Sequence, residues 1–179
     1  MGLGAGTLAR YGKAGQTFRI YELDPGVIHM ARSQFTYLSD SAAKIEVVEG
    51  DARIRLRDEL PQHFDVLAID AFSSDSIPTH LLTAEAASLY RRHLGERGVL
   101  LIHISNRMLK LEPVVASMAH HLGWSAQYFH SPGDATRATY DANWMVLAAR
   151  PVPVPGARPA TAQLVNWTDD FASIWRVLD

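Results

Sequence analysis

The stretch that decides the fold is MGLGAGTLARYG, residues 1–12 of the 179-residue chain. Gly2, Gly4 and Gly6 follow the pattern of the glycine-rich turn that comes after the first strand of a nucleotide-binding α/β fold. The spacing is G-x-G-x-G, with Thr7 where the dinucleotide fingerprint has its third glycine. Since only the initial methionine precedes the turn, the sequence predicts a nucleotide-binding loop without the strand that usually leads into it.

Predicted helices and strands alternate downstream of this turn. A short helix is predicted in GTLARYGKAG, and longer helices in PGVIHMARSQFTYL, THLLTAEAASLYRRHL and LEPVVASMAHHLG. Apolar segments typical of strands occur in TFRIYELDP, FDVLAIDAF and RGVLLIHIS, and KIEVVEGDARIRL is predicted as a strand through Val48 with a loop at residues 50–51. SAQYFHS and NWMVLAARP follow as two strands joined by a polar turn. This order predicts an α/β fold, a three-layer Rossmann-like sandwich with a mostly parallel sheet and an antiparallel pair at its edge.

The domain organisation follows from the proline content. Residues 1–150 are predicted to form one nucleoside-binding domain. The segment PVPVPGARPA, residues 151–160, holds four prolines in ten residues, which excludes a regular helix or a central strand and predicts an extended connector. NWTDDFASIWRVLD, residues 166–179, is predicted as a helix with Thr168 as its N-cap. Residues 151–179 are expected to pack on the same domain.

Composition narrows the function classes. Hydrophobic residues make up 47% of the chain and charged residues 20%, as in soluble globular proteins. The formal charge of −2 argues against nucleic acid as a partner. With no cysteine, the chain has no thiolate metal ligand or cysteine nucleophile, and we expect no metal site. No apolar run reaches the roughly 18 to 20 residues of a membrane span, so we expect no membrane contact and a cytoplasmic location.

Two acidic residues follow predicted strands in the order that a nucleoside site requires. Glu22 ends the second strand of such a fold, where its carboxylate can accept hydrogen bonds from both ribose hydroxyls. Asp51, with Ala52, follows the next strand and is placed to receive an adenine amino group. The alternatives are a solvated strand-end residue for Glu22 and a helix or turn cap for Asp51.

Together these segments resemble a known family. GLGAGTLARYG, YELDPGVIHMAR, VVEGDARIRL and IDAFSSDSIPTHLLTAEA are similar to the spermidine synthase-like (polyamine aminopropyltransferase) branch of the class I S-adenosylmethionine-dependent methyltransferase fold. WTDDFASIWRVL resembles the tail of larger bacterial members of that branch. The resemblance implies transfer of an aminopropyl group from decarboxylated S-adenosylmethionine to a small amine acceptor.

The resemblance also implies roles for single residues. Asp70 matches the first aspartate of the family's Asp-Ser-x-Asp-Pro loop, the base that deprotonates the acceptor amine. Asp75 corresponds to the second aspartate, in a loop two residues longer than in the family. Tyr140 resembles the tyrosine that holds the acceptor, although an edge-strand aromatic is an equal alternative. His80 and His103 are further candidate bases, but isolated histidines are more often ordinary surface or core residues.

Two departures from the family pattern leave alternatives open. Family members carry an acidic residue in the glycine loop that binds the donor's amine, and this chain has Ala5 there. The ligand is therefore S-adenosylmethionine, its decarboxylated form or methylthioadenosine, and a methyltransferase is the alternative function. The family's first strand and N-terminal domain have no counterpart here. We therefore expect a fragment of a longer protein with unpaired strand edges, prone to homo-oligomerise, and a non-catalytic nucleoside-binding remnant is a third reading.

Overall fold

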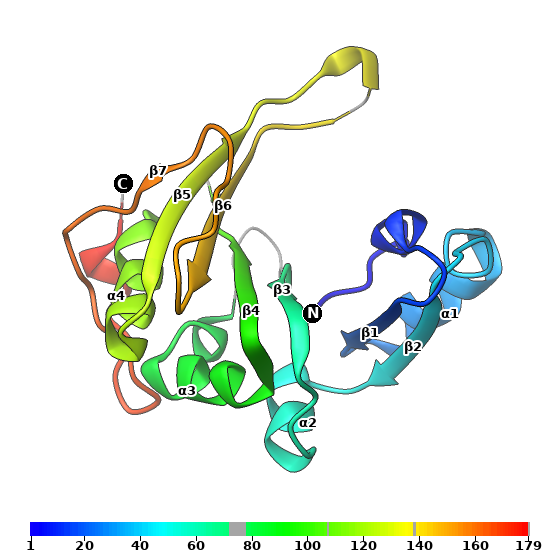
Figure 1. Cartoon of the computed structure of the whole chain (residues 1–179), viewed down its shortest axis with the longest axis horizontal. Helices are drawn as coiled ribbons and strands as arrows, with labels where there is room; N and C mark the ends of the chain where they lie inside the picture. The colour runs from blue at the N-terminus through cyan, green and yellow to red at the C-terminus, as the bar shows by residue number, and fades with distance from the viewer. Residues whose placement is uncertain (72–77, 107, 138, 179) are drawn as a thin grey trace. The chain divides into compact units, whose positions relative to one another are not determined.

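The computed structural model describes residues 1–71, 78–106, 108–137 and 139–178 (Figure 1). Within it the chain divides into two compact units, Met1–Asp58 and Glu59–Asp179. Each unit is described by itself below.

The first unit is built on a two-stranded parallel sheet. Strand β1 (Thr17–Glu22) and strand β2 (Lys44–Glu49) run in register from their first to their last residues. Helix α1 (Pro25–Gln34) is the crossover between them. It begins where predicted, because Asp24 accepts a hydrogen bond from the Gly26 N–H and proline fits the first helical position.

The glycine-rich stretch lies along β1. The backbone N–H of Gly2 donates to the Tyr21 carbonyl at 2.9 Å, so the first residues run beside the end of that strand. Leu3 is buried in a cluster with Ile20 of β1 and Ile28 of α1. The short helix predicted after the glycines is a 3₁₀ helix, η1 (Thr7–Tyr11).

A helix that the sequence analysis missed closes the first unit. Residues 52–58, for which the sequence analysis predicts no element, form α2 (Ala52–Asp58). Asp51 accepts a hydrogen bond from the Ile54 N–H at 2.9 Å and so caps its first turn.

The second unit contains a five-stranded sheet in the order β3-β4-β6-β5-β7. Its strands are β3 (Phe64–Ile69), β4 (Leu94–His103), β5 (Ser125–Ser131), β6 (Ala142–Ala148) and β7 (Arg158–Pro159). Strands β3 and β4 are parallel, whereas β6 is antiparallel to both β4 and β5, and β7 is antiparallel to β5.

The expectation of a mostly parallel sheet is not confirmed. Of the five pairings between named strands, two are parallel and three are antiparallel. The hairpin after β5 turns the chain back, and β6 inserts between β4 and β5 rather than forming an edge. Its last four residues, Met145 to Ala148, are all buried, which explains why this apolar strand is internal.

Two α-helices of the second unit pack on each other and on its sheet. Helix α3 (Ala84–His93) contacts β4, and helix α4 (Glu112–Leu122) contacts β5 and β6. A 3₁₀ turn, η2 (Thr79–Leu81), precedes α3, whose N-cap is Thr83. The α/β class is confirmed, and the three-layer arrangement stays a prediction.

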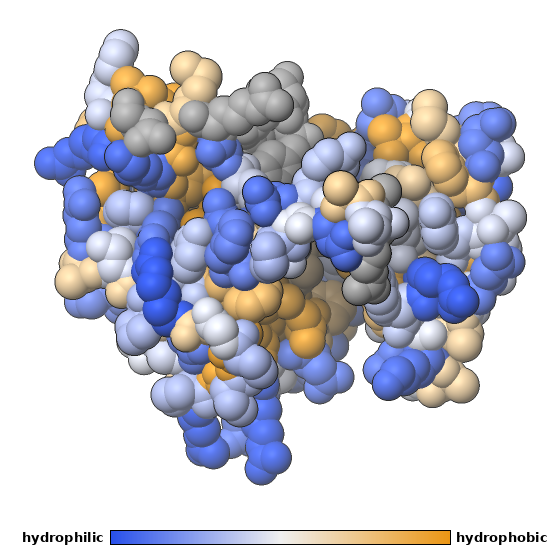
Figure 2. Space-filling view, turned by 90° about the horizontal axis from the view of Figure 1, so that it is seen from above, coloured by the Kyte–Doolittle hydropathy of each residue, from blue (hydrophilic) through white to orange (hydrophobic). Residues whose placement is uncertain are grey.

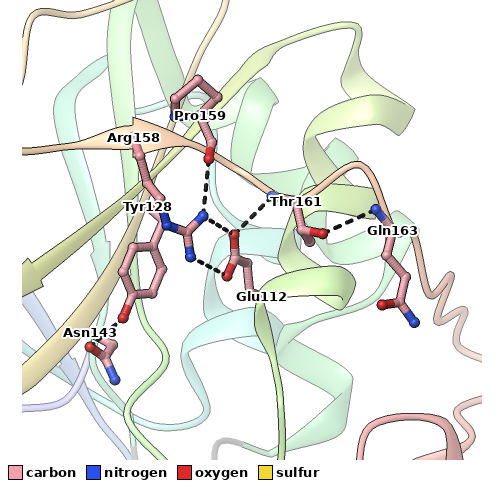
Figure 3. Close-up of polar contacts among 7 residues, drawn as sticks. All are labelled: Glu112, Tyr128, Asn143, Arg158, Pro159, Thr161 and Gln163. Carbon is pink, nitrogen blue, oxygen red and sulfur yellow. Dashed lines mark hydrogen bonds and ion pairs between the residues drawn. The ribbon is translucent and has the colours of Figure 1, made fainter.

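The proline-rich connector forms no regular helix, as predicted, but it makes a turn in which the Ala157 N–H donates to the Val154 carbonyl. Beyond this turn, β7 is held to the sheet edge by a polar cluster (Figure 3). Arg158 of β7 donates to both carboxylate oxygens of Glu112, at 2.7 and 2.8 Å, and Glu112 also accepts the Thr161 N–H at 2.8 Å. The guanidinium lies over the Tyr128 ring, 4.1 Å from its centroid. The hydrogen bonds from Arg158, above all, hold the pKa of Glu112 below its ordinary value.

The predicted C-terminal helix is wrong. Thr168 caps no helix, and the only regular element there is a 3₁₀ turn, η4 (Ile174–Arg176), before the last described residue. Thr168 and Phe171 exchange two backbone hydrogen bonds in a tight turn. Asp169 accepts from the Thr83 hydroxyl and donates its N–H to Glu85, so the residues predicted to begin a helix bind the N-terminus of α3 instead.

Hydrophobic side chains reach the surface in places among hydrophilic ones (Figure 2). The most exposed large ones include Tyr140, Trp175 and Leu60. Within the described part of the chain, no helix combines the length and apolar character needed to cross a bilayer.

Candidate functional site

Asp70 and His103 meet at the carboxyl ends of two adjacent strands. Ile69 of β3 is paired in register with Ile102 of β4, so the next residue of each strand emerges at the same end of the sheet. The Asp70 Oδ1 lies 2.7 Å from His103 Nδ1. The Asp70 side chain is 36% exposed and that of His103 19%, so the carboxylate stays accessible while the imidazole is largely enclosed.

The imidazole of His103 is held on its other sides as well. Its Nε2 lies 2.8 Å from the Ser105 hydroxyl, which also accepts the Asn143 backbone N–H at 2.8 Å. Trp144, the register partner of His103 on β6, stacks on the ring with a centroid distance of 4.6 Å and an interplanar angle of 12°. These contacts fix both the position and the plane of the imidazole.

The polar contacts continue across the sheet toward its edge. The Asn143 side-chain oxygen accepts from the Tyr128 hydroxyl at 2.7 Å (Figure 3) and lies 2.9 Å from His130 Nδ1. Tyr128 in turn lies under Arg158. Consecutive contacts thus connect Asp70, directly after β3, with residues of β4, β6, β5 and β7.

His103 is the residue that the sequence analysis undervalued. Its sequence context is that of an isolated histidine, yet the structure places it against the predicted base. The signal in the sequence was its position at the end of the apolar run VLLIH, on the strand predicted to follow β3 in a parallel sheet.

The other residues predicted to bind the acceptor are Tyr140 and Asp75. Tyr140 lies on the loop between β5 and β6 and is 89% exposed. Asp75 falls outside the described residues. The roles proposed for both stay predictions.

In the first unit the glycine loop and Glu22 are directly connected. Gly4 and Gly6 have φ angles of +52° and +85°, a region that strongly favours glycine. Glu22 accepts the Leu3 N–H through one carboxylate oxygen at 2.9 Å and the Asp24 N–H through the other at 3.0 Å. Each carboxylate oxygen has a second lone pair, so Glu22 can support the loop and still accept hydrogen bonds from a ligand.

Asp51 and Ala52 stand at the start of α2. One oxygen of Asp51 caps the helix, which is the structural alternative stated for this residue. The contact of Asp51 to adenine stays a prediction. Among the described residues, no group of three or more histidine and acidic side chains is placed to hold a metal ion.

The fold belongs to the Rossmann-like class found in methyltransferases and spermidine synthases. The chain is similar in structure to human methyltransferase-like protein 13 in complex with SAH, with a TM-score of 0.66, 18% identity, and 87% of this chain and 73% of that chain covered. It is also similar to a probable spermidine synthase from Corynebacterium glutamicum ATCC 13032, with a TM-score of 0.61, 19% identity, and 83% and 53% covered.

A relative found by sequence comparison confirms the predicted resemblance to the spermidine synthase-like family. The chain is 31% identical over 84 residues to a polyamine aminopropyltransferase of Vibrio vulnificus (strain CMCP6), covering 46% of this chain and 27% of the relative. No family model matches. The chain thus corresponds to part of its relatives, about half of the Corynebacterium protein and about a quarter of the Vibrio one. These relatives are transferases.

Proposed function

We propose that the chain is the transferase region of a spermidine synthase-like enzyme, which moves an aminopropyl group from decarboxylated S-adenosylmethionine to an amine. The observation that carries the proposal is Asp70, an accessible carboxylate at the end of β3 held by His103. The similarity to a polyamine aminopropyltransferase supports the same reaction.

The chemistry requires a base at this place. The acceptor is an ammonium ion at neutral pH and must lose one proton before its nitrogen can attack the carbon next to the sulfonium. As the N–C bond forms, the C–S bond breaks and its electron pair stays on sulfur as a neutral thioether. Asp70 takes the proton, and its negative charge favours binding of the cationic acceptor.

The adenosyl part of the donor is assigned to the first unit. In this proposal the loop of Gly2, Gly4 and Gly6 lies against the ligand, Glu22 accepts hydrogen bonds from the ribose, and Asp51 with Ala52 contacts adenine. The left-handed backbone conformation of Gly4 and Gly6 supports this assignment, and so does the hydrogen bond between Glu22 and the Leu3 N–H of the loop.

Methyl transfer from S-adenosylmethionine is the second candidate. It is favoured by Ala5, which leaves the glycine loop without the acid expected for decarboxylated donor, and by the similarity in fold to a methyltransferase in complex with SAH.

Calorimetry and product analysis with both donors test the proposal. We expect the 179-residue chain to bind decarboxylated S-adenosylmethionine and to form an aminopropylated product from a panel of diamines. If a methylated product forms from S-adenosylmethionine and no aminopropylated product forms from its decarboxylated form, the proposal of aminopropyl transfer gives way to methyl transfer. Binding of neither donor, nor of methylthioadenosine, would contradict both candidates.

A further inference from the structure

We infer that His103 is a positioning residue for Asp70, whose neutral imidazole donates the Nδ1 proton to Oδ1 and leaves Oδ2 as the oxygen that takes the acceptor's proton. The inference rests on the proposed function, because it assigns a role toward Asp70 as the base. It adds a second residue and a defined protonation state to the site.

The direction of the hydrogen bonds follows from their two ends. The Asn143 backbone N–H can only donate, so the Ser105 oxygen accepts there. An ionised Asp70 can only accept, so His103 Nδ1 carries a proton. In a neutral imidazole Nε2 is then an acceptor, and the Ser105 hydroxyl donates to it at 2.8 Å. One direction of donation thus accounts for all three contacts.

The ring is also kept from turning away. His103 lies on β4 next to Trp144 of β6, and the two rings are stacked nearly parallel. Since its side chain is only 19% exposed, the imidazole has little freedom to adopt another rotamer. A base held in one orientation loses less entropy when the substrate binds.

The charge of the imidazole matters for the reaction. A protonated His103 would place a positive charge beside a carboxylate that must attract a cationic amine and accept its proton. The neutral imidazole is therefore the active form. Among the described residues, the ionisable groups connected to His103 by hydrogen bonds include Asp70 directly, and Tyr128 and His130 through Asn143.

The test compares substitutions of His103 by kcat and its dependence on pH. His103→Asn keeps an amide N–H close to the place of Nδ1 and cannot gain a charge. We expect it to retain kcat within about threefold at pH 8 and to lose the part of the wild type's expected fall in kcat at acidic pH that comes from protonation of the imidazole. His103→Ala should lose kcat about 10- to 100-fold with little change in donor affinity. Equal losses in both variants, or an unchanged acid limb in His103→Asn, would overturn the inference.

Two further variants separate positioning from other roles. His121 also contacts a serine, Ser88, at 2.9 Å, but no carboxylate in the described part of the chain. His121→Gln is therefore the matched control and should behave as wild type. Ser105→Ala should cost only a few-fold in kcat, because it removes one hydrogen bond to the imidazole while Asp70 still accepts the Nδ1 proton. A loss as large as that of Asp70→Asn would overturn the assignment by making Ser105 itself a reacting group.

Imidazole ¹⁵N NMR of the resting chain supplies a readout that needs no turnover. We expect neutral His103 to carry its proton on Nδ1 in the wild type and also in Ser105→Ala, because the ionised Asp70 accepts that proton in both. An Nε2–H form in the wild type overturns the inference whatever the chain catalyses. An Nδ1–H form in a chain without aminopropyl transfer contradicts the proposed function and still supports the hydrogen-bond assignment.

Discussion

Arg158 of the connector donates two hydrogen bonds to Glu112 at the start of α4, a bidentate contact between residues 46 positions apart. Glu112 has an 18% exposed side chain, so the pair is partly shielded from solvent. Because the pKa of Glu112 is lowered in the folded chain, its contribution to stability is present above about pH 4.5 and is lost as the pH falls through the lowered pKa.

Glu112→Gln should therefore lower the free energy of unfolding by about 1 kcal/mol at pH 7 and by less at pH 3.5. Urea denaturation at pH 7 and at pH 3.5 measures this change in the free energy of unfolding. Asp58→Asn is the control, since Asp58 pairs with Arg57 on an exposed surface and should have little effect. A loss for Glu112→Gln that is the same at both pH values would contradict the role of its charge.

Gly4→Ala and Gly15→Ala form a matched pair in the first unit. Both glycines have positive φ, +52° and +84°, and neither would bring a Cβ within 4 Å of another atom. Each substitution should cost about 1 kcal/mol of backbone strain. Only Gly4→Ala should also weaken binding of S-adenosylhomocysteine, by tenfold or more, because the ligand approaches that backbone. Calorimetry showing equal affinities for the two variants would remove Gly4 from the site.

Glu22→Gln should weaken binding of an adenosyl ligand by about 1.5 to 3 kcal/mol, the range for hydrogen bonds to a charged group. Glu49, the register partner of Glu22 on β2, is exposed, and Glu49→Gln should bind as wild type. Circular dichroism checks that Glu22→Gln remains folded, since Glu22 also holds the Leu3 N–H. Unchanged affinity in a folded variant would reduce Glu22 to a structural residue.

Asp51→Asn separates the two roles of Asp51. Asparagine is as good an N-cap as aspartate, so α2 should keep its stability. The substitution removes the charged acceptor of the adenine amino group, so we expect Asp51→Asn to bind an adenosyl ligand more weakly than the wild type does. We also expect the wild type to bind an inosine analogue more weakly than the adenosyl ligand. Equal binding of adenosyl and inosyl ligands by the wild type would contradict the adenine contact.

The elements predicted well are those with local signals. Asp24 and Pro25 mark the start of α1, and the apolar runs of β3 and β4 gave the correct strands. The strand ends predicted from the sequence also hold in the structure. Glu22 ends β1, Asp51 lies two residues after β2, and Asp70 directly follows β3.

The elements predicted poorly depend on distant contacts. The segment that begins at Thr168 has a good helix-capping sequence but forms a tight turn instead. The buried Trp167 and the hydrogen bonds of Asp169 to Thr83 and Glu85 stabilise that conformation. The pairing of Asp70 with His103 also depends on side-chain rotamers on two strands, and a single sequence fixes only that both residues lie at one end of the sheet.

Turnover of Asp70→Asn tests the central claim most directly. Asparagine keeps the shape of the side chain and removes the base, so aminopropyl transfer should fall about 10²- to 10⁴-fold while adenosyl-ligand affinity and the free energy of unfolding change little. A stable Asp70→Asn protein with near-normal turnover, or a wild-type chain that transfers nothing from either donor, would contradict the account.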